Sequence, residues 1–213
     1  MYRVEAFEIE NQAILTAHLA EHPFASLVIN GDEGPCVEHL PLELDGSIGA
    51  RGALLGHVSR ANPVWRQGDA LRALAVFVGP QAYVSPAWYA TKATDPRVVP
   101  TWNYAAVHVS GTLRFFHDAS RLHDLLTRLT DRFESMRSTP WHVSDAPADF
   151  IERMSTGIVG LELEIDRMQG KWKMSQNRPP ADRAGVIEGL RHEARASRSV
   201  ADVMAAFDGF SEE

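Results

Sequence analysis

Hydrophobic and polar residues alternate along much of this chain, which is the pattern of half-buried β-strands. Between residues 157 and 168 (GIVGLELEIDRM), leucine and isoleucine side chains alternate with acidic ones, so one face is apolar and the other is charged. The Asn-Gly and Asp-Gly pairs near the start of the chain indicate tight turns. Further strands are predicted at 24–30, 35–44, 48–58, 71–78, 102–109 and 111–116.

Helical periodicity marks most of the remaining chain. The clearest amphipathic helix is predicted at 119–138, where the apolar stripe consists of Leu122, Leu125, Leu126, Leu129, Phe133 and Met136. Shorter helices are predicted at 11–22 and 150–155, and the last thirty residues also have a helical pattern.

The order of these elements favours one class of fold. The strands are short and regular helical crossovers do not separate them, so we expect an antiparallel barrel and not a doubly wound parallel sheet. The fold class is therefore mainly β with peripheral helices (α+β). We expect one domain over residues 1–213, with a helical insert at about 119–155 and a helical C-terminal tail at about 181–210.

Composition narrows the classes of partner. The chain has 213 residues, of which 45% are hydrophobic, and a formal net charge of -7 at pH 7. Proteins dedicated to nucleic acids usually carry a basic surface, so this balance argues against DNA as the main partner. No apolar run is long enough to cross a bilayer and the N-terminus lacks the features of a signal peptide, so we expect a cytoplasmic protein without a membrane partner. A single cysteine, Cys36, excludes an internal disulfide and a cysteine-based zinc site.

Residues 79–111 form an unusual aromatic stretch. They contain two of the five tryptophans and three of the four tyrosines, and four prolines interrupt them. Prolines between aromatic residues favour a rigid segment that presents a planar surface. Such a surface suits a core, an interface or a ligand platform, and the pattern alone leaves these three roles open.

Two polar clusters indicate anion binding. In His57-Val58-Ser59-Arg60, a hydroxyl and a guanidinium next to backbone N–H groups can bind a phosphate, although a capping serine and an exposed arginine are the simpler interpretation. Residues 171–178 (KWKMSQNR) contain three cations and three polar donors without an acid, which suits an anion or a solvated loop. Trp172 is expected in the core. Together with the aromatic stretch, the two clusters suggest a planar aromatic phosphate such as flavin mononucleotide (FMN).

The sequence supports metal binding and acid–base catalysis less strongly than it supports anion binding. His18 and His22 share a helical face at a spacing that can hold a metal, but no acidic third ligand is evident and we expect no metal. His57 or His108 could act as an acid or base, yet histidines on strands are more often structural. The catalytic residues are therefore unknown, and the sequence leaves open whether the protein is an enzyme.

Five sequence blocks resemble the PaiB family, which is described as FMN-binding negative transcriptional regulators. They occur in the family's order over nearly the whole chain. The blocks are EHLP at 38–41, GHVSRANP at 56–63, GP with YVSPAWY at 79–89, VPTWNY at 99–104 and GKWKMSQNR at 170–178.

This resemblance implies a split β-barrel of the pyridoxamine-phosphate-oxidase-like, FMN-binding type. It also implies a homodimer with FMN in clefts between the subunits, and a role in negative transcriptional regulation. The positions that match the phosphate-binding region are His39, Leu40, Pro41, His57, Ser59 and Arg60. Those expected near the isoalloxazine ring are Trp88, Trp102, Asn103, Lys173, Ser175, Gln176, Asn177 and Arg178. The wider group has a second basic residue after the Ser-Arg pair, where this chain has Ala61.

Three functional hypotheses follow. The first is an FMN-binding homodimer, and its alternative form is a flavin-dependent oxidoreductase of a small substrate. The second is a repressor that binds DNA, which the family label suggests and the charge does not support. The third is a non-catalytic module that has lost its cofactor, which the presence of Ala61 keeps open.

Overall fold

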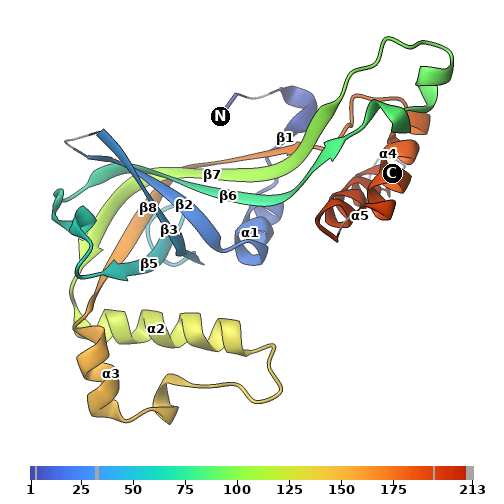
Figure 1. Ribbon diagram of the computed structural model, residues 1–213. Coiled ribbons are helices and arrows are strands. Elements are labelled where there is room, and N and C mark those ends of the chain that lie inside the picture. Colours follow the sequence, from blue (N-terminus) through green and yellow to red (C-terminus); the bar gives the residue numbers. More distant parts are fainter. Residues whose placement is uncertain (3, 32–33, 194, 210–213) are drawn as a thin grey trace. The chain divides into compact units, whose positions relative to one another are not determined.

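The computed structural model describes residues 1–2, 4–31, 34–193 and 195–209 (Figure 1). Its helices are α1 (Gln12–Glu21), α2 (Ala119–Glu134), α3 (Ala148–Ser155), α4 (Pro180–His192) and α5 (Arg195–Gly209). Its strands are β1 (Glu8–Ile9), β2 (Phe24–Gly31), β3 (Gly34–Pro41), β4 (Glu43–Asp45), β5 (Ala53–Ser59), β6 (Leu71–Val84), β7 (Thr101–Phe116) and β8 (Ile158–Lys173). Short 3₁₀ turns lie at η1 (Glu5–Phe7), η2 (Pro63–Arg66), η3 (Pro86–Trp88), η4 (Ala90–Ala93) and η5 (Val143–Asp145).

The strands form one curled antiparallel sheet in the order β3-β2-β6-β7-β8-β5-β4, and β1 pairs with β8. Strands β3 and β5 lie near opposite ends of this order and still contact one another, as expected when a sheet curls toward a barrel. The prediction of a mainly β fold with peripheral helices is confirmed.

The contacts of the chain group into two compact units. The first unit contains Met1–His18, Phe77–His108 and Gln169–Glu213, and the second contains Leu19–Val76 and Val109–Met168. Within the first unit, α4 and α5 pack side by side (Figure 1). Within the second unit, α2 packs against η5 and α3. One domain over residues 1–213 stays a prediction.

The predicted strand boundaries were wrong at several glycines. Strand β6 continues past Gly79 and Pro80 to Val84, and β7 is one strand where two were predicted. β7 passes through Gly111 because a Cβ there would clash with the backbone carbonyl of Glu164, so the glycine permits close packing and does not end the strand. Strand β8 likewise continues to Lys173.

The third predicted strand was too long at its beginning. Strand β5 starts only at Ala53, because the chain turns at Gly49 and Gly52, where φ is +63° and +86°. Those backbone conformations belong to turns and favour glycine.

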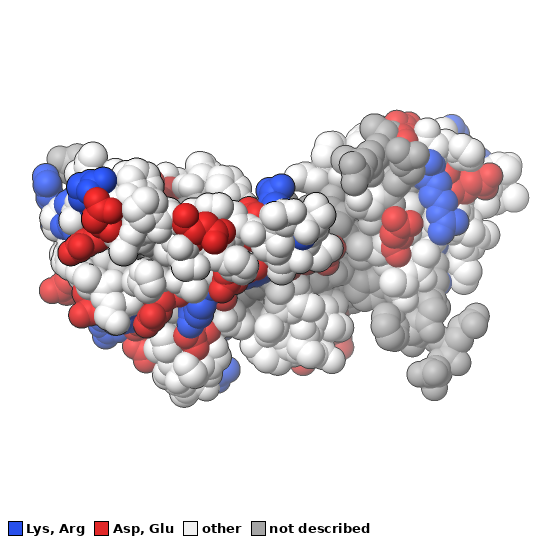
Figure 2. Space-filling model, turned by 90° about the horizontal axis from the view of Figure 1, so that it is seen from below, with Lys and Arg blue, Asp and Glu red and all other residues white. Residues whose placement is uncertain are grey.

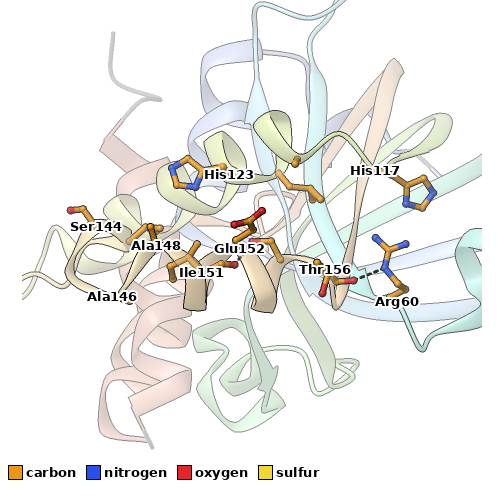
Figure 3. Close-up of a pocket in the computed structure, with 13 residues that line it drawn as sticks. Arg60, His117, His123, Ser144, Ala146, Ala148, Ile151, Glu152 and Thr156 are labelled. Carbon is orange, nitrogen blue, oxygen red and sulfur yellow. Dashed lines mark hydrogen bonds between the residues drawn. The ribbon is translucent and has the colours of Figure 1, made fainter.

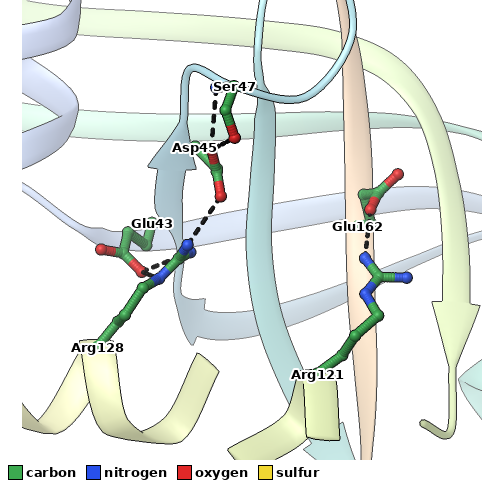
Figure 4. Close-up of polar contacts among 6 residues, drawn as sticks. All are labelled: Glu43, Asp45, Ser47, Arg121, Arg128 and Glu162. Carbon is green, nitrogen blue, oxygen red and sulfur yellow. Dashed lines mark hydrogen bonds and ion pairs between the residues drawn. The ribbon is translucent and has the colours of Figure 1, made fainter. Parts of the chain in front are cut away.

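Helix α2 confirms the first part of the predicted apolar stripe, but the helix ends at Glu134 and not at 138, and Phe133 (45%) and Met136 (93%) are exposed. Leu125 and Leu129 are buried and pack in one cluster with Leu55 of β5. Ion pairs beside this stripe also join the helix to the sheet, as Figure 4 shows. The Arg128 guanidinium donates to the carboxylates of Glu43 (3.1 Å) and Asp45 (2.8 Å) on β4, and Arg121 donates to Glu162 on β8 (2.6 Å).

The Asp45 contacts make part of the stability dependent on pH. Hydrogen bonds from the Ser47 hydroxyl and the Arg128 guanidinium lower the pKa of Asp45 from 3.8 to about 2. A carboxyl whose pKa is lowered by folding stabilises the fold above its unfolded pKa, and this contribution is lost as the pH falls through the folded pKa. We expect Asp45→Asn to lower the free energy of unfolding at neutral pH by about 1 kcal/mol, a value discounted for solvent screening.

Urea unfolding at neutral pH, at about pH 4 and at about pH 2 measures this difference. The gap between wild type and variant should close between about pH 4 and about pH 2. Asp124→Asn replaces an exposed carboxyl on α2, the helix that carries Arg128, and serves as the control. A gap that stays constant down to the lowest pH would contradict the role given to the Asp45 carboxylate.

Among the residues that the structure describes, no helix is both long enough and apolar enough to cross a membrane.

Candidate cofactor site

Strands β3 and β5 bring four of the predicted phosphate-binding residues around one cavity in the second unit. This cavity, which we call the cofactor cavity, has a volume of about 370 Å³. His39 and Leu40 come from β3, and His57 and Ser59 come from β5. Two segments far apart in the sequence, EHLP and GHVSRANP, therefore supply the walls of one cavity. Asn62 also lines it, a residue that the sequence analysis did not assign to the site.

The polar groups of the cofactor cavity are only partly used by the protein. The Nδ1 atom of His57 is buried and has no hydrogen-bond partner among the described residues. Burial also lowers the pKa of His57, which favours the neutral imidazole. The Nδ1 atom of His39, another lining residue, lies 3.1 Å from the hydroxyl of Ser26 on β2 and shares a hydrogen bond with it.

The turn after β5 shows the serine in its capping role. The Ser59 Oγ atom accepts a hydrogen bond from the N–H of Ala61 (3.2 Å), and the Asn62 Oδ1 atom accepts one from the N–H of Val64 (2.9 Å). The hydroxyl proton of Ser59 and the amide protons of Asn62 have no acceptor in these two bonds. Both residues can therefore still donate into the cofactor cavity.

Arg60 and Pro41 lie differently from their four neighbours. The Arg60 guanidinium donates to the backbone carbonyls of Thr156 (2.6 Å) and Ile158 (3.0 Å). It lines a second cavity and is absent from the lining of the first. Pro41 ends β3, beyond the residues that line the cofactor cavity.

The second cavity was not predicted from the sequence. It has a volume of about 890 Å³ and lies between α2, α3 and the segment around η5, all in the second unit (Figure 3). We call it the insert cavity, because most of its lining belongs to the helical insert. No local motif could have indicated it, since its walls come from four separate segments of the chain.

Residues 79–108 of the aromatic stretch lie in the first unit, where part of them packs against α4. A Cβ at Gly189 of α4 would clash with the indole of Trp88, and one at Gly185 would clash with the Trp88 carbonyl oxygen. The buried carboxylate of Asp182 accepts hydrogen bonds from the N–H (2.9 Å) and the hydroxyl (2.8 Å) of Thr91. Trp88 is thus half-buried against α4, and its contact with a flavin stays a prediction.

Trp102 is the more accessible of the two predicted tryptophans. Its side chain is 49% exposed, and its indole N–H donates to the Gln81 side chain (3.1 Å). It meets Tyr83, which is 50% exposed, edge to face at 6.3 Å between ring centres. The Lys173 ammonium donates to the Trp102 carbonyl (3.1 Å) and to the Thr101 hydroxyl, and burial lowers the pKa of Lys173.

Asn103 and Ser175 form a buried pair. The Asn103 side chain has no exposed surface and Ser175 is 4% exposed. The Asn103 amide donates to the Ser175 hydroxyl (3.1 Å), and its Nδ2 atom also lies 3.3 Å from the sulfur of Met204 on α5. The structure gives both residues a packing role within the first unit, and their direct contact with a flavin stays a prediction.

In the block after Lys173, the side chain of Gln176 hydrogen-bonds to the backbone of its own segment. Gln176 donates to the carbonyl of Trp172 (2.6 Å) and accepts from the N–H of Met174 (2.7 Å). The Arg178 guanidinium lies over the ring of Tyr89, 4.5 Å from its centre, and Asn177 is exposed. Trp172 is 6% exposed, which confirms its expected place in the core.

Charge and metal-binding groups are unremarkable in the described part of the chain. On the face that Figure 2 shows, acidic and basic residues are interspersed and its described surface carries no broad basic patch. No cluster of three or more metal-binding side chains occurs among the described residues. The Nε2 atom of His18 lies 3.3 Å from the carbonyl of Phe77, and its ring meets Trp172 edge to face.

Comparisons with known proteins identify the family of this chain. Residues 1–167 match the family model described as "Putative FMN-binding domain". The chain is 31% identical to the protease synthase and sporulation protein PAI 2 of Bacillus subtilis, with 96% of each chain covered. It is 36% identical to an uncharacterized protein of Emericella nidulans, with 78% of this chain and 76% of that protein covered.

Solved structures show the fold. A flavocytochrome of Azotobacter vinelandii superposes with a TM-score of 0.58 at 15% identity, and the match covers 81% of this chain and 72% of the flavocytochrome chain. An FAD- and haem-binding protein of Mycobacterium smegmatis gives a TM-score of 0.54 at 18% identity, and the match covers 78% of this chain and 73% of that protein. The split β-barrel fold is confirmed, and so are the predicted family and cofactor. The chain belongs to the FMN-binding PaiB family, and FMN is the cofactor that this membership assigns to it.

Proposed function

We propose that this protein acts as a homodimeric FMN-binding regulator, with the polar tail of FMN in the cofactor cavity. One observation carries this proposal. The cavity unites the two predicted phosphate-binding segments, and its lining residue His57 has a buried Nδ1 atom without a hydrogen-bond partner among the described residues. An unpaired buried polar atom is costly, so its presence in a cavity favours a ligand that pairs with it.

The donors of the cofactor cavity fit the ribityl and phosphate groups of FMN. The Ser59 hydroxyl, the Asn62 amide and the imidazoles of His39 and His57 can all donate to oxygen atoms. No lysine or arginine is among the residues that line this cavity. These residues therefore bind FMN through hydrogen bonds from uncharged groups and not through a clamp of cations. This agrees with Ala61, which stands where the wider group has a second basic residue.

Bound FMN supplies one- and two-electron redox chemistry, and the protein supplies binding and orientation. His57 lines the cofactor cavity from a strand that pairs with β8 through His57↔Gly160. Because burial keeps this imidazole neutral, it can donate from one nitrogen and accept at the other.

The regulatory part of the proposal rests on likeness to PAI 2, whose name refers to protease synthesis and sporulation. The net charge of -7 disfavours a mode of action based on extended contact with DNA. Retention of a fragment from the protein's own promoter, measured at low and rising salt, tests this. Sequence-specific retention at low salt would overturn the view that regulation proceeds without direct DNA contact.

The homodimer is proposed from exposed aromatic surface in the first unit. Tyr83 and Trp102 touch one another and each exposes about half of its side chain. Val78, on the same strand as Tyr83, is 48% exposed. Tyrosine and tryptophan are enriched among the residues that dominate protein interfaces, so this pair suits contact with a second copy of the chain.

The proposed FMN site predicts a specific loss of affinity. His57→Ala should raise the dissociation constant for FMN about tenfold, because one buried hydrogen bond to the cofactor is lost. Titration of FMN fluorescence with the purified protein measures the constant.

A matched control separates this effect from the loss of any histidine. His192→Ala removes an exposed histidine of α4 and should leave the constant unchanged. If His57→Ala binds FMN as tightly as wild type, the cofactor cavity is not where the flavin binds. If wild type itself quenches no flavin fluorescence at tens of micromolar, FMN binding fails altogether.

A further inference from the structure

The insert cavity has one cationic end. The Nε and Nη2 atoms of Arg60 donate to the carbonyls of Thr156 (2.6 Å) and Ile158 (3.0 Å), which fixes the orientation of the guanidinium. Both acceptors are neutral, and none of the ion pairs found among the described residues involves Arg60. Its positive charge therefore stays uncompensated within this part of the chain, and Nη1 keeps its protons for another acceptor. Figure 3 shows His117 at the same end of the cavity.

The rest of the insert cavity is mostly apolar. Leu122 of α2 and Val143 of η5 are buried, and Ile151 of α3 is half-buried. Ala119 and Ala148 face the space from α2 and α3, where larger side chains would fill it. At about 890 Å³, the volume lies within the range of small-molecule sites.

One acidic group limits the charge of a ligand. Glu152 of α3 also lines the cavity, and Figure 3 shows it between the Arg60 end and the Ser144 end. A carboxylate at that place disfavours a second negative charge along the body of a ligand. The cavity thus presents a fixed cation at one end, several apolar side chains along its walls and a single acid between its ends.

We propose that the insert cavity binds an organic monoanion with an apolar body, such as an alkyl or aryl carboxylate, whose carboxylate pairs with Arg60. A planar guanidinium held in place by two backbone carbonyls suits a carboxylate, because little side-chain entropy is lost when the pair forms. This site is separate from the FMN cavity, although Ser59 of that cavity precedes Arg60 in the chain.

Displacement of a fluorescent probe tests the proposal. The probe is 8-anilinonaphthalene-1-sulfonate, an aryl monoanion, and the competitors are decanoate and neutral 1-decanol. We expect decanoate to displace one equivalent of probe per chain, and 1-decanol to be at least about tenfold weaker because it cannot pair with Arg60. Arg60→Gln should remove the difference between the two competitors.

Two neighbouring substitutions give matched variants. Ala119→Phe fills the cavity and should weaken decanoate at least about tenfold, whereas Ser120→Phe adds the same ring at a position that does not line it. Ala148→Phe repeats the filling from α3, in case Ala119→Phe unfolds. FMN titration of each variant should match wild type, so the result does not depend on where FMN binds.

The proposal has clear contrary results. It fails if both filled variants fold and still bind decanoate as wild type does. It also fails if decanoate and 1-decanol displace the probe equally from wild type, since the cavity would then be an apolar groove without anion recognition.

Discussion

Replacing Asp182 with alanine is expected to lower the free energy of unfolding by about 3 kcal/mol. The Asp182 carboxylate has no exposed surface, and it accepts hydrogen bonds from both the N–H and the hydroxyl of Thr91. Its removal would leave two donors without an acceptor, and each such group costs about 1–3 kcal/mol when buried. A loss of this size is a large share of the stability of an ordinary domain.

The same pair provides graded variants for urea unfolding. Thr91→Val removes only the hydroxyl donor and should cost about 1 kcal/mol. Asp202→Ala removes an exposed carboxyl of α5 and should change stability by less than about 0.5 kcal/mol. Equal effects of Asp182→Ala and Asp202→Ala would mean that the hydrogen bonds to Thr91 do not hold the aromatic stretch on α4.

Long, strongly patterned elements were predictable because burial on one face leaves a periodic trace in the sequence. The stripe of α2 indicated the helix, and its members Leu122, Leu125 and Leu129 are buried, whereas Phe133 at the end of the helix and Met136 beyond it are exposed. Strand boundaries were harder. Gly111 was taken for a break, yet its missing side chain makes room for the carbonyl of Glu164 in the middle of a strand. Sequence shows that a glycine is present, but not which backbone approaches it.

The candidate site was predictable where chemistry is local. His57 and Ser59 are two residues apart in the sequence, and the structure brings His39 to the same cavity. Side-chain direction was not predictable for Asn103 and Ser175. The family resemblance placed both near the flavin, and the structure shows that they hydrogen-bond to each other in the interior of the first unit. Polar type alone does not distinguish a binding residue from a buried pair that satisfies itself.

The insert cavity shows the limit of motif-based reasoning. Arg60 belongs to a recognisable block, and its expected partner was a phosphate in the same block's cavity. The structure instead directs its guanidinium toward the start of β8 and a space enclosed by the helical insert. That space depends on the packing of α2 against α3 and η5, which no pattern within one segment encodes.

The homodimer proposal makes the other large prediction. Trp102→Asp should raise the dissociation constant of the dimer at least about 100-fold. A central tryptophan typically contributes 2 kcal/mol or more, and a two-fold interface contains each residue twice. The new carboxylates would also repel one another. The side chain is 49% exposed in the isolated chain, so its loss should cost the fold of each subunit little.

Light scattering coupled to gel filtration, over a range of protein concentrations, measures the change in mass. Trp141→Asp is the matched control, because Trp141 is 44% exposed in the second unit and should leave the dimer intact. Because the family resemblance implies that FMN lies between subunits, we expect Trp102→Asp to lose FMN affinity at concentrations where it is monomeric, and to regain part of it when concentrated. If the Trp102→Asp protein stays dimeric, the interface lies elsewhere. If it is monomeric and still binds FMN as tightly as wild type, one subunit alone forms the flavin site.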